Sequence, residues 1–386
     1  MREVANRMKK IRLLSVLLII VLILPLAACG NSGSNSSNDA NGGTGSTTGA
    51  NIAFIIPANQ TLGINDRAWI QNIWEAMSEF CAQNSKTCTY YQAVDDSKQS
   101  HVDTYELAIQ NGAEVVFSCG NEAADALKEV PWDYPDVKFI SLEAFGLEGM
   151  QIAPNHRDII TDQEQAGWLA GVAAVREGYK TLGVIPCWDL PTLNMWSWGY
   201  IQGLNYAAKK YNIAGISVRH HYANSASANP ETQALAASWY SDGVDCIQCN
   251  TAGGNNSVIA AATAANKPVF GADSDEYAEG ATVITSAVVD RTKVTQEALA
   301  SVYDGTFEGG VELWPGAKEG VSKLAPWEHA RFTVYTEEQY EQDLADLSND
   351  VDGIASDMIT PVDAPDIDTF LKLMEPVSVI DIIHIK

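Results

Sequence analysis

Residues 112–119 read Gly-Ala-Glu-Val-Val-Phe-Ser-Cys, and residues 243–250 read Gly-Val-Asp-Cys-Ile-Gln-Cys-Asn. Each stretch is a glycine turn that leads into a short apolar run, which is typical of a strand buried on both faces. Around each of them, short strands alternate with helical patterns, first over 51–142 and again over 181–272. This rhythm predicts a parallel sheet covered by helices on both faces. The predicted fold class is therefore α/β, with two doubly wound lobes rather than one wide sheet.

The predicted lobes have the following bounds. Lobe 1 covers 51–158, lobe 2 covers 159–279, and part of 280–305 returns to lobe 1. The stretch 306–386 holds crossing segments and C-terminal additions to the lobes. A chain that leaves one lobe, builds a second and then returns forms several hinge strands, and such an architecture opens and closes.

The first fifty residues are predicted to lie outside both lobes. A basic start is followed by an apolar run over 13–24, which is short for a membrane-spanning helix. Leu26-Ala-Ala-Cys29 is a lipobox. We therefore expect a lipoprotein signal peptide over 1–28, a lipidated Cys29 with a flexible tether over 29–50, and an extracytoplasmic protein anchored to the cell membrane. The alternative is a transmembrane anchor in which Cys29 is incidental.

The charge balance narrows the class of partner. The chain has 386 residues, with 24 Lys and Arg against 49 Asp and Glu, which gives a formal net charge of −25. Removal of the signal peptide takes away five basic residues and one acidic residue, so the mature protein is more acidic still. This excludes nucleic-acid binding through a basic surface and disfavours polyanionic ligands.

The cysteines leave two alternatives open. Cys81 and Cys88 flank a short polar turn and are a candidate disulfide pair, whereas Cys246 and Cys249 form a CxxC inside a predicted strand. Thioredoxin-like chemistry needs that motif at the start of a helix, so a redox role is not expected there. Buried free thiols are the other interpretation, and we favour it for most of the six cysteines beyond Cys29.

Ligands of open parallel sheets bind at the carboxyl ends of the strands, so the loops after the first strand of each lobe are the first candidates. These loops lead to Trp69 and Trp196, each near the start of a helix. Two facing indoles are predicted to clamp a flat aromatic ligand, and the alternative is that they pack in the core.

Carboxylates supply the polar candidates. Asp66 lies three residues before Trp69, and its alternative role is a helix N-cap. Asp273 and Asp275 follow a buried strand and are predicted to accept hydrogen bonds from ligand hydroxyls. For these two the alternative is a solvated acidic loop.

Signatures of catalysis are absent from the sequence. It contains no GxxxxGK, GxSxG or HExxH motif. His220 and His221 alternate across a predicted strand, which argues against joint metal ligation. We therefore expect neither an enzyme nor a cofactor or metal.

Six stretches together resemble the BMP (basic membrane protein, PnrA-like) family of substrate-binding lipoproteins. They are the lipobox, Gly63-Ile-Asn-Asp-Arg-Ala-Trp69, Ala166-Gly-Trp-Leu-Ala-Gly-Val-Ala-Ala174, Trp198-Gly-Tyr-Ile-Gln-Gly203, Gly271-Ala-Asp-Ser-Asp275 and Ile284-Thr-Ser286. The likeness covers about 51–309. It implies a type I periplasmic-binding-protein fold and a protein that hands purine nucleosides to an ABC importer.

The resemblance also implies roles for single residues. Trp69 and Trp196 take the places of two aromatic residues that sandwich the base, Asn65 and Asp66 belong to the base-side loop, and Asp273 or Asp275 binds ribose hydroxyls. Two positions depart from the family pattern, because Ile70 stands where Asn is expected and Val289 where Lys is expected. These changes leave a free nucleobase or another flat heterocycle as an alternative ligand.

The sequence thus predicts a monomeric, lipid-anchored binding protein that serves ABC permease and ATPase subunits. Three alternatives remain: a lipid-anchored sensor with the same fold, a protein that binds a non-nucleoside such as a sugar, and an extracytoplasmic hydrolase.

Overall fold

The structure is a computed structural model that describes residues 50–60, 62–65, 69–147 and 149–385. The predicted signal peptide, Cys29 and Asp66 lie outside the described residues, as does the tether except for Ala50. Within the described ranges, no helix has the length and apolar character that a membrane span requires.

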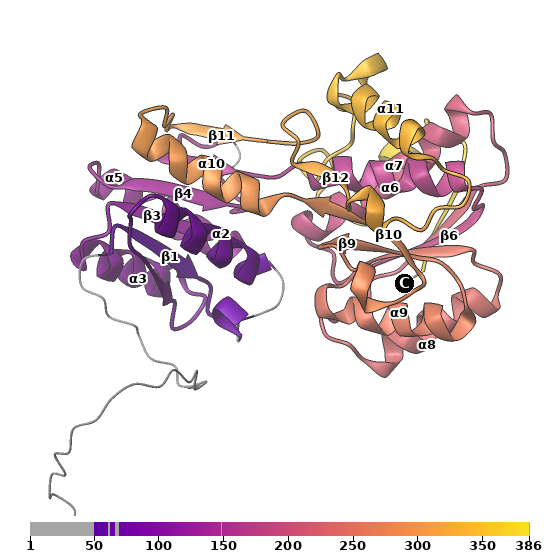
Figure 1. The fold of residues 1–386 in the computed structure, drawn as a ribbon, viewed down its shortest axis with the longest axis horizontal. Coiled ribbons are helices and arrows are strands. Elements are labelled where there is room, and N and C mark those ends of the chain that lie inside the picture. The colour runs from indigo at the N-terminus through magenta and orange to yellow at the C-terminus, as the bar shows by residue number, and fades with distance from the viewer. Residues whose placement is uncertain (1–49, 61, 66–68, 148, 386) are drawn as a thin grey trace, which may run out of the picture. The chain divides into compact units, whose positions relative to one another are not determined.

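The first sheet is wholly parallel. Its described strands follow the order β11-β5-β4-β3-β1-β2 (Figure 1). They are β1 (Ile52–Ile56), β2 (Cys88–Gln92), β3 (Val115–Cys119), β4 (Lys138–Leu142), β5 (His156–Ile159) and β11 (Val311–Leu313). The helices that accompany it are α2 (Trp69–Gln83), α3 (Lys98–Gln110), α4 (Ala124–Leu127), α5 (Val130–Asp133) and α10 (Arg291–Asp304).

Strand β1 shows why this sheet is covered on both faces. All five of its residues are buried. Ile52, Phe54 and Ile56 belong to the same apolar cluster as Met77 of α2. The alternate residues Ala53 and Ile55 belong to a second cluster, together with Tyr105 of α3. Successive side chains point to opposite faces, so a strand that is apolar at every position needs a helix layer on each side.

The second sheet follows the order β12-β10-β9-β8-β6-β7-β13. All its neighbours are parallel except β12, which runs antiparallel to β10. Its strands are β6 (Thr181–Pro186), β7 (Ser217–His220), β8 (Cys246–Asn250), β9 (Val269–Asp273), β10 (Val283–Val289), β12 (Ser322–Leu324) and β13 (Asp381–His384). Its helices are α6 (Gln163–Glu177), α7 (Pro191–Lys210), α8 (Pro230–Ser241), α9 (Asn255–Ala265), α11 (Glu337–Ser348) and α12 (Ile367–Met374).

Helices cover both faces of this sheet, and on one face two of them are in close backbone contact. In Figure 1, α6 and α7 lie on one side of the sheet, and α8 and α9 lie on the other. Helices α6 and α7 approach closely at glycine: a Cβ atom on Gly199 would lie 1.9 Å from the Glu164 carbonyl oxygen, and one on Gly171 would lie 2.2 Å from the Tyr200 carbonyl oxygen. Glycines at i and i+4 on both helices, Gly167 with Gly171 and Gly199 with Gly203, thus allow backbone-to-backbone contact.

Within the described residues, the chain passes between the two sheets in three places. It does so after β5, after β10 and after β11. These segments are bonded to one another: the Ile160 amide donates to the Leu313 carbonyl at 2.8 Å, and the Asp290 amide donates to the Val321 carbonyl at 2.9 Å. These hydrogen bonds join the crossing segments after β5, β10 and β11, and we call these segments together the strap.

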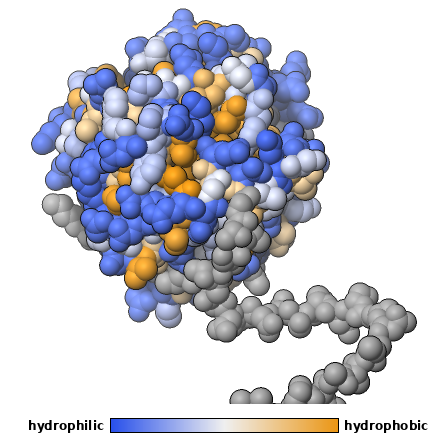
Figure 2. Space-filling model, turned by 90° about the vertical axis from the view of Figure 1, so that its left-hand side faces the viewer, coloured by the Kyte–Doolittle hydropathy of each residue, from blue (hydrophilic) through white to orange (hydrophobic). Residues whose placement is uncertain are grey.

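The C-terminal segment joins the second sheet. Strand β13 pairs with β7, and the Phe370 ring of α12 stacks on Trp198 of α7 at 4.8 Å between ring centroids and 7° between planes. The strand that the C-terminal segment adds to this sheet covers four residues, Asp381–His384. The face shown in Figure 2 is largely hydrophilic, with small separate hydrophobic areas.

Buried histidines give the fold a dependence on pH. Burial lowers the pKa of His156, in β5, to about 3, and its Nε2 lies 2.7 Å from Ser141 Oγ. Between about pH 6.5 and pH 3, His156 is therefore protonated in the unfolded chain and neutral in the folded chain. This contribution to stability is complete above about pH 6.5 and is lost as the pH falls, by at most about 1.4 kcal/mol per pH unit.

We expect His156→Gln, which keeps a polar side chain beside Ser141, to flatten the fall in unfolding free energy between pH 6.5 and 3. Urea denaturation at a series of pH values measures this slope. An unchanged slope in the variant would show that His156 does not resist protonation in the folded state.

Candidate ligand-binding site

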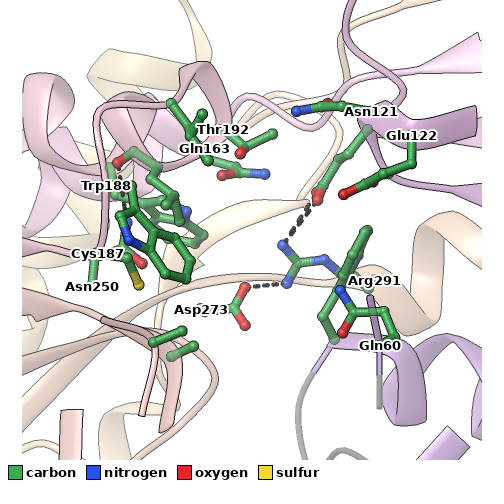
Figure 3. Close-up of a pocket in the computed structure, with 18 residues that line it drawn as sticks. Gln60, Asn121, Glu122, Gln163, Cys187, Trp188, Thr192, Asn250, Asp273 and Arg291 are labelled. Atoms are coloured by element: carbon green, nitrogen blue, oxygen red, sulfur yellow. Dashed lines mark hydrogen bonds and ion pairs between the residues drawn. The ribbon is translucent and has the colours of Figure 1, made fainter. Parts of the chain in front are cut away.

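A cavity of about 290 Å³ lies where the carboxyl ends of strands from both sheets meet. Gly120 and Asn121 follow β3 and Glu143 follows β4, whereas Trp188 follows β6 and Asp273 ends β9. These are the positions at which parallel sheets present ligand-binding loops. Gln60, Glu122, Gln163, Cys187, Thr192 and Asn250 complete the polar part of the wall (Figure 3).

A buried arginine forms the charged centre of the cavity. The Arg291 guanidinium donates to Asp273 Oδ1 at 2.5 Å and to Glu143 Oε1 at 3.2 Å (Figure 3). Burial lowers the pKa of Arg291, but the two carboxylates outweigh this effect and hold the pKa above its ordinary value. Glu143 belongs to the first sheet and Asp273 to the second, so Arg291 joins acidic groups from both.

The backbone at both acidic residues is unusual. Glu143 has φ of 59° and Asp273 has φ of 79°, in the left-handed region that non-glycine residues seldom adopt. Such conformations cost free energy and concentrate at functional sites, where the surrounding structure holds them. Glu143 is further fixed by Thr161 Oγ1, which donates to Glu143 Oε1 at 2.7 Å.

Three tryptophans form the aromatic part of the wall: Trp69 at the start of α2, Trp188 in the loop after β6, and Trp196 in α7. Trp188 is 40% exposed and Trp196 only 2%. Trp69 lies against Gly120, where a Cβ atom would come within 3.2 Å of the indole ring. Glycine at 120 therefore makes room for Trp69, and its φ of 87° also favours glycine.

A further acidic residue, Glu276, lies in the loop that follows Asp273. Burial raises the pKa of Glu276 to about 8, and its Oε1 accepts a hydrogen bond from Asn255 Nδ2 at 2.9 Å. Glu276 is absent from the cavity wall. Its amide donates to Ser286 Oγ at 3.1 Å, so this residue holds the loop that follows Asp273.

The structure brings some of the predicted site residues together and leaves others apart. Trp69, Trp196 and Asp273 line one cavity, whereas Asn65 is exposed and lies outside its wall. Asp275 also lies outside it, with Oδ2 at 2.5 Å from His329 Nδ1. Asp66 and Cys29 are not among the described residues.

The positive charge of the cavity was not assigned from the sequence. Val289, which stands where the family pattern has Lys, is only 7% exposed and packs in the core. Arg291, two residues later at the start of α10, is the side chain that enters the cavity. The signal for it was present, since Arg291 lies two residues after the end of β10, but its spacing from Thr285-Ser286 did not match the pattern. Glu143 and Trp188 were also missed, although Glu143 directly follows β4 and Trp188 lies two residues after the end of β6.

Solved structures show which class of fold this is. An ABC transporter solute-binding protein from Conexibacter woesei matches 78% of this chain and 96% of its own, with a TM-score of 0.62 and 20% identity. The arabinose-binding protein AraP from Geobacillus stearothermophilus matches 72% of this chain and 97% of its own, with a TM-score of 0.56 and 9% identity. The predicted fold class, that of type I periplasmic binding proteins, is confirmed.

The family is equally clear. The family model described as ABC transporter substrate-binding protein PnrA-like (Bmp) matches residues 50–351, so the chain belongs to this family of substrate-binding proteins, which are not enzymes. The ABC transporter nucleoside-binding protein BmpA of Lactococcus lactis is 25% identical over 297 residues, which are 71% of this chain and 80% of that protein. Basic membrane protein B of Borreliella afzelii is 26% identical over 244 residues, 61% of this chain and 70% of that protein.

Proposed function

We propose that this protein binds a purine nucleoside, or a closely related flat heterocycle, in the cavity between the two sheets and delivers it to an ABC permease. The observation that carries the proposal is the combination of three indoles with a charged centre built from both sheets. The nucleoside-binding relative BmpA supports it. The predicted lipid on Cys29 would hold the protein at the outer surface of the cell membrane.

The energetics favour a ligand that has both a flat ring and hydroxyl groups. One aromatic stack contributes about 1 to 3 kcal/mol, whereas micromolar binding requires about 8 kcal/mol. Polar contacts must supply the remainder. Asp273, Gln163 and Asn250 offer acceptors and amide donors in the same wall as the indoles. A base between the indoles with a ribose near Asp273 uses both sets of groups.

The charges of the wall favour a neutral ligand. Glu122, Glu143 and Asp273 carry three negative charges against the single positive charge of Arg291. Two of the carboxylates already bind Arg291, so this cation is neutralised before any ligand enters. A phosphate group would meet net negative potential, which favours nucleosides over nucleotides.

Closure about the strap is the mechanism that fits this arrangement. Arg291 begins α10 immediately after a crossing segment, and its two carboxylate partners come from different sheets. A ligand that touches both walls stabilises the closed form by its differential affinity for that form. A thermal-shift screen of nucleosides, nucleobases and sugars tests the ligand class: we expect purine nucleosides to raise the melting temperature most.

We expect Trp69→Ala to weaken binding of the best nucleoside by about 5- to 150-fold, because the variant loses one stack of about 1 to 3 kcal/mol. Intrinsic fluorescence or calorimetry measures the affinity. Trp132→Ala is the matched control, since Trp132 is 44% exposed in α5 and lies outside the cavity wall. Equal affinities in the two variants would remove Trp69 from the proposed clamp.

A further inference from the structure

Cys81 and Cys88 lie side by side at the junction between α2 and β2. All six described cysteines are free thiols. The side chains of Cys81 and Cys88 are hydrogen-bonded to each other, and Cys88 packs against the apolar cluster that contains Cys81. Nothing in the cavity or in its proposed ligand uses this pair.

The local chain geometry explains why the two thiols meet. Two residues after the end of α2, Ser85 adopts the left-handed region at φ of 54°, and the Lys86 amide donates to the Cys81 carbonyl at 2.9 Å. This is the pattern of a Schellman C-cap, which reverses the chain direction within a few residues. Cys88 then opens β2, whose pairing with β1 fixes it in place. The turn between the two cysteines is thus held by hydrogen bonds at both ends.

The two thiols differ in reactivity. Cys88 is partly exposed, and its hydrogen bond with Cys81 lowers its pKa to about 7 although burial opposes this. Cys81 is only 3% exposed, and its hydrogen bond with Cys88 together with burial raises its pKa. An accessible thiol of low pKa beside a protected partner is the usual arrangement of an attacking and a resolving cysteine.

We propose that Cys81 and Cys88 form a reversible disulfide that ties the C-terminal end of α2 to the first residue of β2. The oxidant is a disulfide RSSR, carried by a small molecule or by a protein. The Cys88 thiolate attacks one sulfur of RSSR, which forms a mixed disulfide and releases one thiolate RS⁻. Cys81 then loses its proton to solvent and attacks Cys88 Sγ, which releases the second RS⁻ and completes the intramolecular bond.

This disulfide closes a short loop and restrains the unfolded chain, so the oxidised protein is the more stable form. Helix α2 also presents Trp69 at its other end and packs against α10, which begins with Arg291. The disulfide would stabilise this helix layer whatever ligand the cavity binds.

The CxxC of β8 provides an internal control. Cys246 and Cys249 are both fully buried, and burial raises the pKa of each thiol. They are three positions apart in one strand, so their side chains point to opposite faces of the sheet. Neither thiol is accessible to an oxidant, and the geometry of a strand prevents them from meeting.

The test is oxidation of the purified full-length protein with glutathione disulfide, followed by alkylation and mass spectrometry, with dithiothreitol-treated protein as reference. We expect the oxidised protein to lose the mass of two hydrogens, to yield one cross-linked fragment that contains Cys81 and Cys88, and to leave Cys246 and Cys249 alkylated once unfolded. Its melting temperature should exceed that of the reduced protein by about 3 °C or more.

The variant Cys81→Ser sharpens the test, because it removes the resolving thiol and keeps the attacking one. We expect it to gain the mass of one glutathione at Cys88, whereas Cys88→Ser should gain none at Cys81. Two free thiols at 81 and 88 after oxidation of the folded wild-type protein, or a cross-link between other cysteines, would overturn the proposal.

Discussion

Replacement of Gly199 by Ala is expected to destabilise the protein by more than about 3 kcal/mol, because the added methyl group would overlap backbone atoms of the neighbouring helix. The added Cβ would lie 1.9 Å from the Glu164 carbonyl oxygen and 2.6 Å from its carbonyl carbon. Both atoms belong to the backbone of α6, so no side-chain rotation relieves the clash. Helices α6 and α7 would have to separate along their whole contact.

Urea denaturation measures this loss as a shift of the unfolding midpoint. Gly253→Ala is the matched control, since Gly253 is exposed and an added Cβ there would meet its nearest atom, the Ala226 carbonyl oxygen, at 3.3 Å. We expect the control to change the stability by less than about 1 kcal/mol. Similar midpoints for the two variants would contradict the close helix contact.

Replacement of Arg291 by Met is expected to cost about 3 to 5 kcal/mol near pH 7, because it leaves buried carboxylates without their cation. The side chains of Arg291 and Glu143 are each 5% exposed, and that of Asp273 is 23% exposed. Urea denaturation of wild type and variant near pH 7 measures the difference in unfolding free energy.

Two further variants separate the ion pair from simple loss of packing. Arg219→Met removes a pair with Asp242 whose side chains are 25% and 60% exposed, and should cost less than about 1 kcal/mol. In Arg291→Met/Glu143→Gln one of the two unpaired carboxylates is gone and Asp273 remains, so part of the lost stability should return. A double variant as unstable as the sum of its single variants would show that the carboxylate does not cause the penalty.

The alternation of strands and helices was predictable because the strands are buried on both faces and are therefore apolar throughout. Strand β5 was missed for the opposite reason. His156, Arg157 and Asp158 are polar, and in the fold each side chain has a hydrogen-bond partner. Arg157 Nε, for example, donates to the Glu308 carbonyl at 2.8 Å. Strands β11 and β12 have three residues each, too few to establish a period of two.

The candidate site was predictable where it depends on one strand end and not where it depends on a tertiary contact. Trp69 and Asp273 follow from the rule that loops at the carboxyl ends of strands bind ligands. The pair of Glu143 and Arg291 joins residues 148 positions apart, so only the fold brings them together. The environment of Asp275 was equally hidden, because its partner His329 comes from the stretch that follows β12, 54 positions away.

Calorimetric titration with inosine, hypoxanthine and ribose is the sharpest test of the proposal that the cavity between the sheets binds a purine nucleoside. We predict that inosine binds with a micromolar or lower Kd, which corresponds to about 8 kcal/mol or more, that hypoxanthine binds more weakly, and that ribose does not bind. Binding of ribose or another free sugar, with the nucleoside and the base left unbound, would exclude the proposed function.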